Sequence, residues 1–542
     1  MTRRPSSVDG PPAESGCVSG SANPATRRLN DGELRVEGRR ASAIVDAMAF
    51  SRDTGLPKLF LSTLTSHDEP RRRRERFPPI VLVALALCLL ACGPKERTWK
   101  DEKGPGPAAG SSAAHDSGNL PATPSSIRST VLVIEPDAPP GTDLDTVGRE
   151  APAGGAPRSS RLQEVIERAD GPLTIELPAG YYVLSPSRYE DPSCGNCEDP
   201  KTPAHATRGL RVHGHGIHIR SSEPEGAVIV TRAGYGILFD GCEDCSLEGV
   251  TVTGGARDGD GKATDAAVVV LESTVRVAGC RIADNIGDPE TVRRTVVGII
   301  GITGREGSDI HIEGCTIERN SWDGIALYRG ARASIQDNVV DGIDSAAGAT
   351  VGGGRGVGIG LTWDARATIT GNLVRHYWKG IGVFVDARAD VRENVVEDIL
   401  TWGISLWDAG KGKPAAEFRR NVIYRTGACG AMIARSEGGD PTSGVLMENI
   451  LVMTGQNPKY DSGEPYCRQQ ALADEAVPAG FLVSGNVFSE NREPGSKPGS
   501  RDVDHATFVE KARGLLPRPP NRALSRSRFA ADFPELFSAA GP

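Results

Sequence analysis

Three aspartates near the ends of successive apolar segments are the side chains best suited to chemistry: Asp364, Asp386 and Asp408. Two carboxylates on either side of a bond can act as general acid and general base, and their separation decides whether a water molecule fits between them. A lyase would instead need a base and a cation, such as Lys379 or a bound Ca²⁺, to hold the negative charge that develops. The residue types predict one of these two chemistries without deciding between them.

Aromatic and polar residues gather around these aspartates, and five of the six tryptophans lie between residues 322 and 407. Aromatic rings can stack on the apolar faces of sugars, and the polar neighbours can bond to hydroxyl groups. This composition predicts a carbohydrate-binding groove. Its candidate residues are Trp322, Asp323, Tyr328, His376, Trp378, Phe384 and Trp407.

A short repeat between residues 247 and 488 must position these side chains. One pattern occurs nine times: an apolar residue, then Val, Cys or Asn three positions later, then another apolar residue two positions further on. The shortest interval is 22 or 23 residues, with β-branched residues at alternating positions, which predicts strands stacked as the coils of a solenoid. Neighbouring coils would share one core. A ladder of buried amides is expected at one corner, formed by Asn338, Asn372, Asn394, Asn421, Asn449 and Asn486.

Four successive coils each contain a glycine that opens a strand, namely Gly324, Gly358, Gly380 and Gly403. Alternation places the residue two positions later on the outer face, and all four are small: Ala326, Gly360, Gly382 and Ser405. With coils about 4.8 Å apart, they predict an outward strip about 15 Å long between two aromatic borders. In the alternative interpretation the glycines are only turn residues. The aspartates of the two Asp-Ala-Arg corners, Asp364 and Asp386, would then pair with Arg366 and Arg388 on the surface.

The repeats ASIQDNVVDGI, ATITGNLV and ADVRENVV resemble those of the right-handed parallel β-helix superfamily, which includes pectate lyases and polygalacturonases. The resemblance covers about residues 130 to 490 and implies an all-β solenoid. It implies no single activity, because this scaffold also carries epimerases and non-catalytic proteins. The element Gly214-His215-Gly216 is similar to one of polygalacturonases, but the paired aspartates that should precede it are missing.

Both ends of the solenoid, predicted over residues 128–490, are expected to be covered. Leu162, Val165, Ile166 and Ala169 share one helical face, which predicts a capping helix before the first long strand. Residues 491–542 are predicted to form a carboxyl-terminal capping extension, with helices over 505–516 and 528–538, the second with Phe529, Phe533, Leu536 and Phe537 on one face. These helices would cover the other end of the solenoid or lie along its side.

The amino-terminal region has the organisation of an exported lipoprotein. Residues 1–70 are polar and lack periodicity, which predicts disorder or a start site placed too early. Residues 71–92 combine a basic run, an apolar core and a final cysteine, similar to a bacterial signal peptide that ends in a lipobox. Cys92 is the predicted lipidation site, and residues 93–127 would form a flexible tether. A buried hydrophobic helix is the alternative.

The net charge and the predicted lipid anchor indicate which binding partners and which location to expect. A net charge of -8 gives no basic footprint for nucleic acid. Gly93 and Pro94 do not resemble an inner-membrane retention signal, so we expect an outer-membrane lipoprotein, facing either the periplasm or the surface. The expected partners of this monomer are the membrane, through the lipid, and a polysaccharide, through the solenoid.

Cysteines and a cluster of aspartates raise the question of bound metals. Two C-x-x-C pairs, Cys194/Cys197 and Cys242/Cys245, predict disulfides in an exported protein, with one Cys₄ zinc site as the alternative. Cys280 and Cys315 occupy the ladder position and are expected in the core, while Cys429 could pair with Cys467. Asp258, Asp260 and Asp265 resemble the start of a calcium loop, but the later ligands of an EF-hand are absent, which favours an ordinary insertion loop.

Two functions follow from the sequence. The first is an envelope-anchored β-helix protein that binds a polysaccharide and, if it is an enzyme, cleaves it as a hydrolase or lyase. The alternative is a non-catalytic surface scaffold or adhesin, with loops 185–208, 256–264 and 456–479 as its contact points.

Overall fold

The computed structural model describes residues 130–143, 160–295, 297–343, 356–436, 442–457 and 469–538, all within one compact unit that spans residues 121–542. The predicted signal peptide, Cys92 and the tether lie outside these residues, as does Cys467. Within the described ranges, no helix has the length and apolar character needed to cross a membrane.

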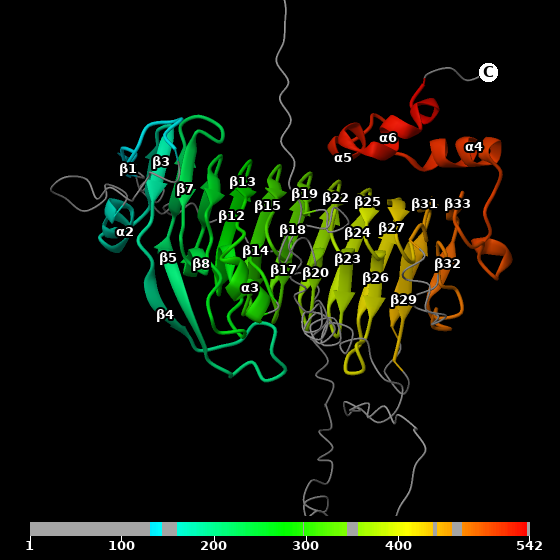
Figure 1. Cartoon of the computed structure of the whole chain (residues 1–542), viewed down its shortest axis with the longest axis horizontal. Helices are drawn as coiled ribbons and strands as arrows, with labels where there is room; N and C mark the ends of the chain where they lie inside the picture. Colours follow the sequence, from blue (N-terminus) through cyan, green and yellow to red (C-terminus); the bar gives the residue numbers. More distant parts are fainter. Residues whose placement is uncertain are drawn as a thin grey trace, which may run out of the picture. The chain divides into compact units, whose positions relative to one another are not determined.

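Three long parallel sheets form the body of this unit (Figure 1). Sheet A has 12 strands, from β1 (Thr130–Val133) to β32 (Leu482–Ser484). Sheet B has 11 strands, from β3 (Gly180–Val183) to β33 (Val487–Ser489). Sheet C has 10 strands, from β4 (Ser187–Asp191) to β29 (Ala431–Ala434), and only its first pair, β4 and β5 (Ala204–His215), is antiparallel.

Each coil passes through sheet C, then sheet A, then sheet B. One full coil consists of β20 (Val357–Leu361), β21 (Arg366–Thr370) and β22 (Leu373–Arg375), after which β23 (Lys379–Phe384) begins the next. Ladder pairing joins each strand to its counterparts one coil before and after, so the predicted parallel β-helix is confirmed.

The interior is a continuous stack of apolar side chains from successive coils. Ile369, Val391, Phe418 and Leu446 lie in register in sheet A, and all four are fully buried. A single coil could not bury such a row, and stacking supplies each side chain with neighbours above and below.

The corner between sheets A and B carries the predicted asparagine ladder. Residues before the asparagines, such as Glu393 and Arg420, adopt positive φ values of 54° and 56° and turn the chain sharply. The side-chain amide of Asn394 donates to Oδ1 of Asn421 at 3.0 Å and to the backbone oxygen of Ile369 at 2.9 Å. The same pattern repeats from Asn338 to Asn486, so these buried amides are satisfied coil by coil.

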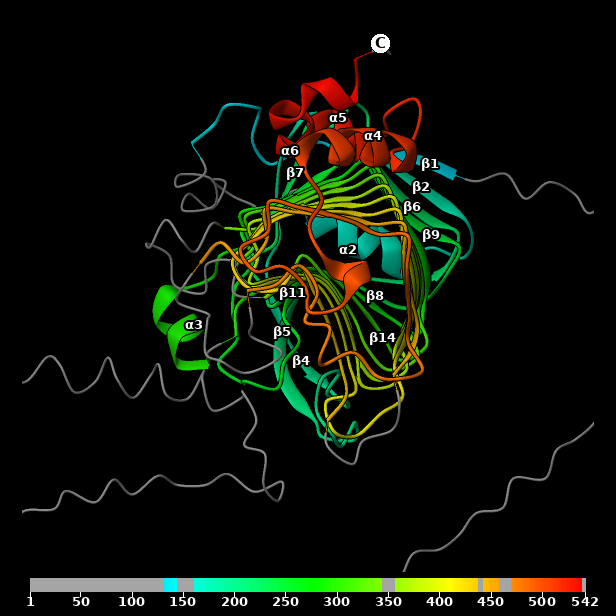
Figure 2. The same cartoon turned by 90° about the vertical axis from the view of Figure 1, so that its right-hand side faces the viewer.

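Helices cover one end and one side of the solenoid. Helix α2 (Ser160–Glu167) packs Leu162 and Ile166 into the core at the amino-terminal end, as predicted. At the other terminus, α4 (His505–Leu515), α5 (Arg522–Arg526) and α6 (Arg528–Asp532) lie along the outer face of sheet B (Figure 2). The helix predicted over 528–538 is broken, because the chain leaves helical geometry at Phe533 and continues as a 3₁₀ turn, Pro534–Leu536.

Candidate functional site

The small residues of sheet C form the predicted row. Ala326 pairs with Gly360, Gly360 with Gly382, and Gly382 with Ser405, on four successive coils. The row is buried, however, so the prediction of an open strip is wrong. At Gly382 the reason is local: a Cβ there would lie 2.4 Å from ring atoms of Phe384, whose side chain is folded over the glycine.

The first half of sheet C is covered by insertion loops. An apolar cluster that includes Tyr235, Leu238 and Val269 lies on its outer face, beneath residues of the loop near Ala263. The hydroxyl of Tyr235 donates to Asp191 at 2.6 Å, and the fully buried Arg305 donates to the same carboxylate at 2.6 Å. These contacts fasten the β4 segment to the sheet, so this half of the face is closed.

Two local disulfides stabilise these segments, between Cys194 and Cys197 and between Cys242 and Cys245. The predicted disulfides are confirmed, and the alternative of a Cys₄ zinc site is wrong because all four sulfurs are bonded in pairs. Cys280 and Cys315 are buried in the ladder, where the thiol of Cys280 donates to the backbone oxygen of Leu247 at 3.3 Å. Burial raises the pKa of Cys280, which suits a core thiol.

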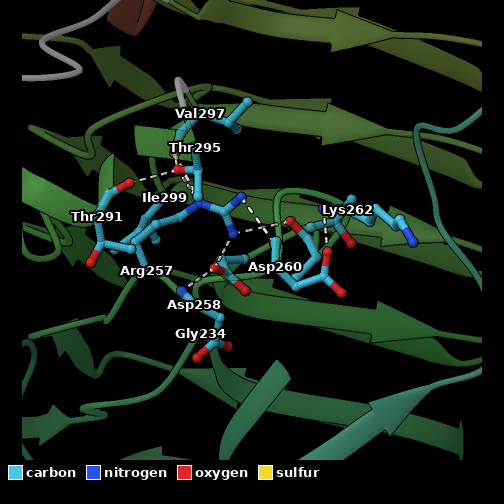
Figure 3. A network of polar contacts seen from close by, with 12 residues as sticks. Gly234, Arg257, Asp258, Asp260, Lys262, Thr291, Thr295, Val297 and Ile299 are labelled. Carbon is cyan, nitrogen blue, oxygen red and sulfur yellow. Dashed lines mark hydrogen bonds and ion pairs between the residues drawn. The ribbon is translucent and has the colours of Figure 1, made fainter. Parts of the chain in front are cut away.

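The aspartates that resemble a calcium loop are held by protein donors (Figure 3). Asp258 accepts from the backbone and hydroxyl of Thr207, and Asp260 accepts from the backbone of His205 and Lys262. Asp265 is bonded to the buried guanidinium of Arg257. Among the described residues, no group of three or more metal-binding side chains is assembled.

An aromatic patch remains at the surface of the second half of sheet C. We define this aromatic patch as Lys379 and Phe384 of β23 with Trp402 and Trp407 of β26 (Trp402–Trp407), all four half-buried. Lys379 is paired with Trp402, and Phe384 with Trp407, across the ladder. The ammonium of Lys379 lies 4.5 Å from the ring centre of Trp402 and 5.5 Å from that of Phe384. The patch therefore presents ring surface and one cation on two adjacent coils.

The other predicted aromatic residues lie elsewhere on the sheet. Trp322 packs, half-buried, against the closed cluster of the first half, and Tyr328 is buried there. Trp378 is half-buried before β23, where its backbone oxygen accepts from the backbone of Thr401 at 3.0 Å. The structure thus brings Lys379, Phe384 and Trp407 together and separates Trp322 and Tyr328 from them.

Sequence reasoning missed two tryptophans. Trp402 stands one position before Gly403, in register with Lys379, and the sequence analysis named Lys379 without the tryptophan at the same position of the next coil. Trp363 has a positive φ of 61°, and its ring lies 4.0 Å below the guanidinium of Arg329. The register of Lys379 with Trp402 could have been found by aligning every position of the four coils rather than alternate ones.

The three candidate aspartates occupy different environments. Asp364 and Asp386 are exposed, and Asp386 accepts from the backbone nitrogen of Lys413 at 2.9 Å. Asp408 is fully buried, and its Oδ1 accepts from the backbone nitrogen of Ser436 at 2.8 Å and from that residue's hydroxyl at 2.9 Å. Asp408 therefore fixes a turn beside the patch. The alternative pairing with Arg366 and Arg388 is not formed within the part of the chain that the structure describes.

Asp323 and His376 have shifted pKa values for different reasons. Burial raises the pKa of Asp323 to about 7, opposed by a hydrogen bond of 2.6 Å from the backbone of Val357 and by the charge of Lys379. His376 lies 2.6 Å from Oδ1 of Asp341, and this bond raises the pKa of the imidazole. His376 is thus engaged in an ion pair at the corner between sheets B and C.

Comparison with known proteins supports the fold. The sequence pattern of the family described as "Right handed beta helix region" matches residues 206–361, which identifies the hand of the solenoid. No curated protein matches the chain in sequence.

Several solved structures share the general architecture at low identity. The chain is similar to Dettilon tailspike protein, with 14% identity, a TM-score of 0.36, and 65% of this chain and 68% of that chain covered. It is also similar to PfbA, a surface adhesin of Streptococcus pneumoniae, with 9% identity, a TM-score of 0.35, and coverage of 59% and 69%. Pectate lyase Pel9A gives 14% identity, a TM-score of 0.31, and coverage of 60% and 80%. Scores this low support no inference about activity.

Proposed function

We propose that this protein binds a polysaccharide on the outer face of sheet C, at the aromatic patch. The observation that carries the proposal is the grouping of Phe384, Trp402 and Trp407 with Lys379 on two adjacent coils, with all four residues half-buried and the ammonium of Lys379 over two of the rings. Three large rings that lie together and partly exposed on one face favour a partner that covers them. Sugar rings suit such a site because their apolar faces stack on aromatic rings and their hydroxyls accept from an ammonium.

The geometry favours binding over cleavage. Asp408 is buried and engaged in a turn, and Asp323 is almost entirely covered. Asp364 and Asp386 are exposed and remain candidates for an acid and a base, with Lys379 as the cation of a lyase. As an enzyme, the protein would act through these residues as a hydrolase or a lyase, with or without Ca²⁺.

We also propose that the solenoid is held at the bacterial outer membrane by a lipid on Cys92, as a monomer. The basic run, the apolar core and the cysteine at residues 71–92 support this anchoring. The second candidate function is a non-catalytic scaffold or adhesin. It is favoured by the closed first half of sheet C and by the helices that cover sheet B, since both remove surface from a substrate.

A polysaccharide binding screen of the full chain tests the proposal. The panel should hold neutral polymers and uronate polymers, the latter with and without Ca²⁺. We expect Trp402→Ala to weaken binding about tenfold, the loss of roughly one stacking contact. Trp363→Ala is the matched control, because it removes a half-buried tryptophan in the turn that follows β20, outside the patch. Equal losses in both variants, or no binding of any polymer by a folded protein, would favour the scaffold function.

A further inference from the structure

The outer face of sheet A is bare, whereas helices cover that of sheet B and insertion loops cover the first half of that of sheet C. Within the described residues, no helix or long loop lies against it, as Figure 2 shows on the side of β2 (Leu173–Leu177), β6 (Ile217–Ser221) and β9 (Cys245–Glu248). Further along the sheet, a shallow hollow of about 680 Å³ crosses its outer surface. It extends from β15 (Asp309–Glu313) to β30 (Ser443–Met447).

Three arginines are stacked in this hollow. Arg332 of β18 (Arg332–Gln336) pairs with Arg366 of β21, and Arg366 pairs with Arg388 of β24 (Arg388–Arg392). All three are exposed. Because neighbouring parallel strands are about 4.8 Å apart, the row places three guanidinium groups along about 10 Å of the solenoid axis. We call these three residues the arginine row.

Arginine-row side chains lack the counter-ions that their neighbours have. Other arginines of the same sheet form ion pairs: Arg276 with Glu248 at 2.8 Å, and Arg419 with Glu417 at 3.0 Å. No described carboxylate forms an ion pair with any member of the arginine row. Like charges directly opposite one another destabilise a sheet, so the row carries an unrelieved repulsion.

Three further carboxylates near the row, Asp309, Asp364 and Asp386, form no ion pair with its arginines. Asp386, two residues before Arg388, accepts from the backbone of Lys413 on the following turn. Oδ2 of Asp364 lies 3.6 Å from the position of a Cβ on Gly330, over the preceding turn. Asp309 stands opposite Arg332 at one end of the row, without forming an ion pair with a described residue. The middle of the row is therefore locally cationic in a chain whose net charge is -8.

The surroundings of the row suit a narrow polar ligand. The outward positions two residues further along these strands are Ser334, Thr368, Asp390 and Glu417, and the two carboxylates form ion pairs with Arg392 and Arg419. The row itself continues into the small residues Ala415 and Ser443 on the next coils. Hydroxyls and small side chains leave a floor on which a flat chain can lie. Guanidinium groups bind carboxylates and sulfates through paired hydrogen bonds, which fixes such a chain in position.

We propose that the arginine row is a binding site for an acidic polysaccharide that lies along the solenoid axis on sheet A. The coil spacing of about 4.8 Å is close to the length of one sugar unit in an extended chain, so successive arginines can meet successive acidic sugars. The acidic group can be a carboxylate or a sulfate. This site is on a different sheet from the aromatic patch, and the inference does not depend on the function proposed for that patch.

A binding assay on the full chain tests this site with defined polymers. Polygalacturonate provides carboxylates, dextran sulfate provides sulfates, and dextran is the neutral control. We expect binding of at least one acidic polymer to weaken about tenfold or more in the triple variant Arg332→Gln/Arg366→Gln/Arg388→Gln, and to weaken with added salt as ionic contacts do. The matched control is Arg211→Gln/Arg220→Gln/Arg276→Gln, which removes the same charge at ion-paired positions outside the hollow. Binding by the control should stay within about threefold of the wild type.

Four outcomes would overturn the inference. They are an absence of binding to both acidic polymers at low salt, equal losses in the two triple variants, equally tight binding of single-stranded DNA at the same row, and a loss caused by Trp402→Ala but not by the arginine variant. The last outcome would place the acidic polymer on the aromatic patch. Loss of neutral-polymer binding alone in Trp402→Ala concerns only the function proposed for sheet C. Thermal unfolding of each variant checks that the solenoid is intact.

Discussion

The outer faces of sheets A and B belong to the same coils and share the same core, yet they differ in what covers them. Sheet B presents an apolar row that includes Leu373, Val395 and Val422, and the carboxyl-terminal helices pack Phe508 and Phe529 against it. Sheet A presents the arginine row and hydroxyl side chains, and no described helix lies on it. The repeat therefore determines the solenoid, whereas the outward residues of each sheet determine whether the protein's own chain or a partner occupies that face.

Polar contacts determine where the helices dock on sheet B. The buried carboxylate of Glu397 accepts from the backbone nitrogens of Arg528 at 3.0 Å and Phe529 at 3.1 Å, at the start of α6. The hydroxyl of Tyr424 donates to Asp532 at 2.6 Å, at the end of the same helix. Burial of apolar side chains supplies the energy of docking, and these bonds supply its register.

The largest expected effect comes from breaking the covered face. Phe529→Ala should lower the free energy of unfolding by about 4 kcal/mol, because it removes a fully buried ring that packs on Tyr424 and Phe533. Chemical denaturation measures this change. Leu482→Ala on sheet A is the control, since that side chain is 50% exposed and should cost less than about 0.5 kcal/mol. Similar costs at both positions would contradict the difference between the two faces.

A somewhat smaller effect is expected at the corner that joins the two sheets. Asn421→Ala should lower the free energy of unfolding by about 3 kcal/mol, because the backbone nitrogen and the side-chain amide of Asn394 both lose the Oδ1 acceptor of Asn421. The buried backbone oxygen of Val391 loses its side-chain donor as well. The control is Asn486→Ala at the end of the ladder, which is only half-buried and should cost about 1 kcal/mol. Thermal and denaturant unfolding compare the two variants. If the terminal asparagine cost as much as the central one, the ladder would not act as a stack.

Sequence patterns predicted the repeat better than they predicted the surfaces. The Asn positions and the pairing of Ala326, Gly360 and Gly382 follow directly from aligning coils, because register in a solenoid is set by the repeat itself. The burial of that row could not be predicted in the same way. It depends on the orientation of the Phe384 ring and on loops such as those near Asp191 and Ala263, which come from distant parts of the chain.

The sequence also did not predict where the carboxyl-terminal helices dock. The helices themselves were predicted from the apolar face that contains Phe529 and Phe533, but two positions, the end and the side of the solenoid, stayed open. The outward apolar residues of sheet B, such as Val395, lie next to inward ones such as Val396. Two apolar neighbours in a short strand do not reveal that both of its faces are covered.

The smallest expected effect is a pH dependence at the corner of sheet B. The bond to Asp341 raises the pKa of His376 from 6.5. The stabilisation that this bond adds to the free energy of unfolding is therefore complete below pH 6.5 and is lost as pH rises through the raised pKa. Burial alone would raise the pKa of Asp341, but the bond to His376 and the charge of Arg375 lower it below 3.8. The stabilisation that the ionised Asp341 provides is therefore lost only as pH falls through that lowered pKa. His376→Gln should therefore lower the free energy of unfolding by about 1 kcal/mol between about pH 5 and 6, and by less at about pH 8.

Unfolding measurements across this pH range check the contribution of the His376–Asp341 pair. Arg392→Gln on sheet A provides the comparison, because it removes an ion pair with Asp390 that contains no histidine. Its cost should not change between about pH 5 and 8. A constant cost for His376→Gln would mean that the histidine contributes by packing alone.

Tryptophan fluorescence tests the central claim most directly, because Trp99 is the sole tryptophan of the chain outside residues 322–407. In the full chain with Trp99→Phe, every tryptophan reports on sheet C, and acrylamide quenching measures the exposure of their rings. We expect a polysaccharide that binds the protein to reduce this quenching, and Trp402→Ala to remove most of the protection. A polymer that binds without changing the quenching would show that the aromatic patch is not the binding surface.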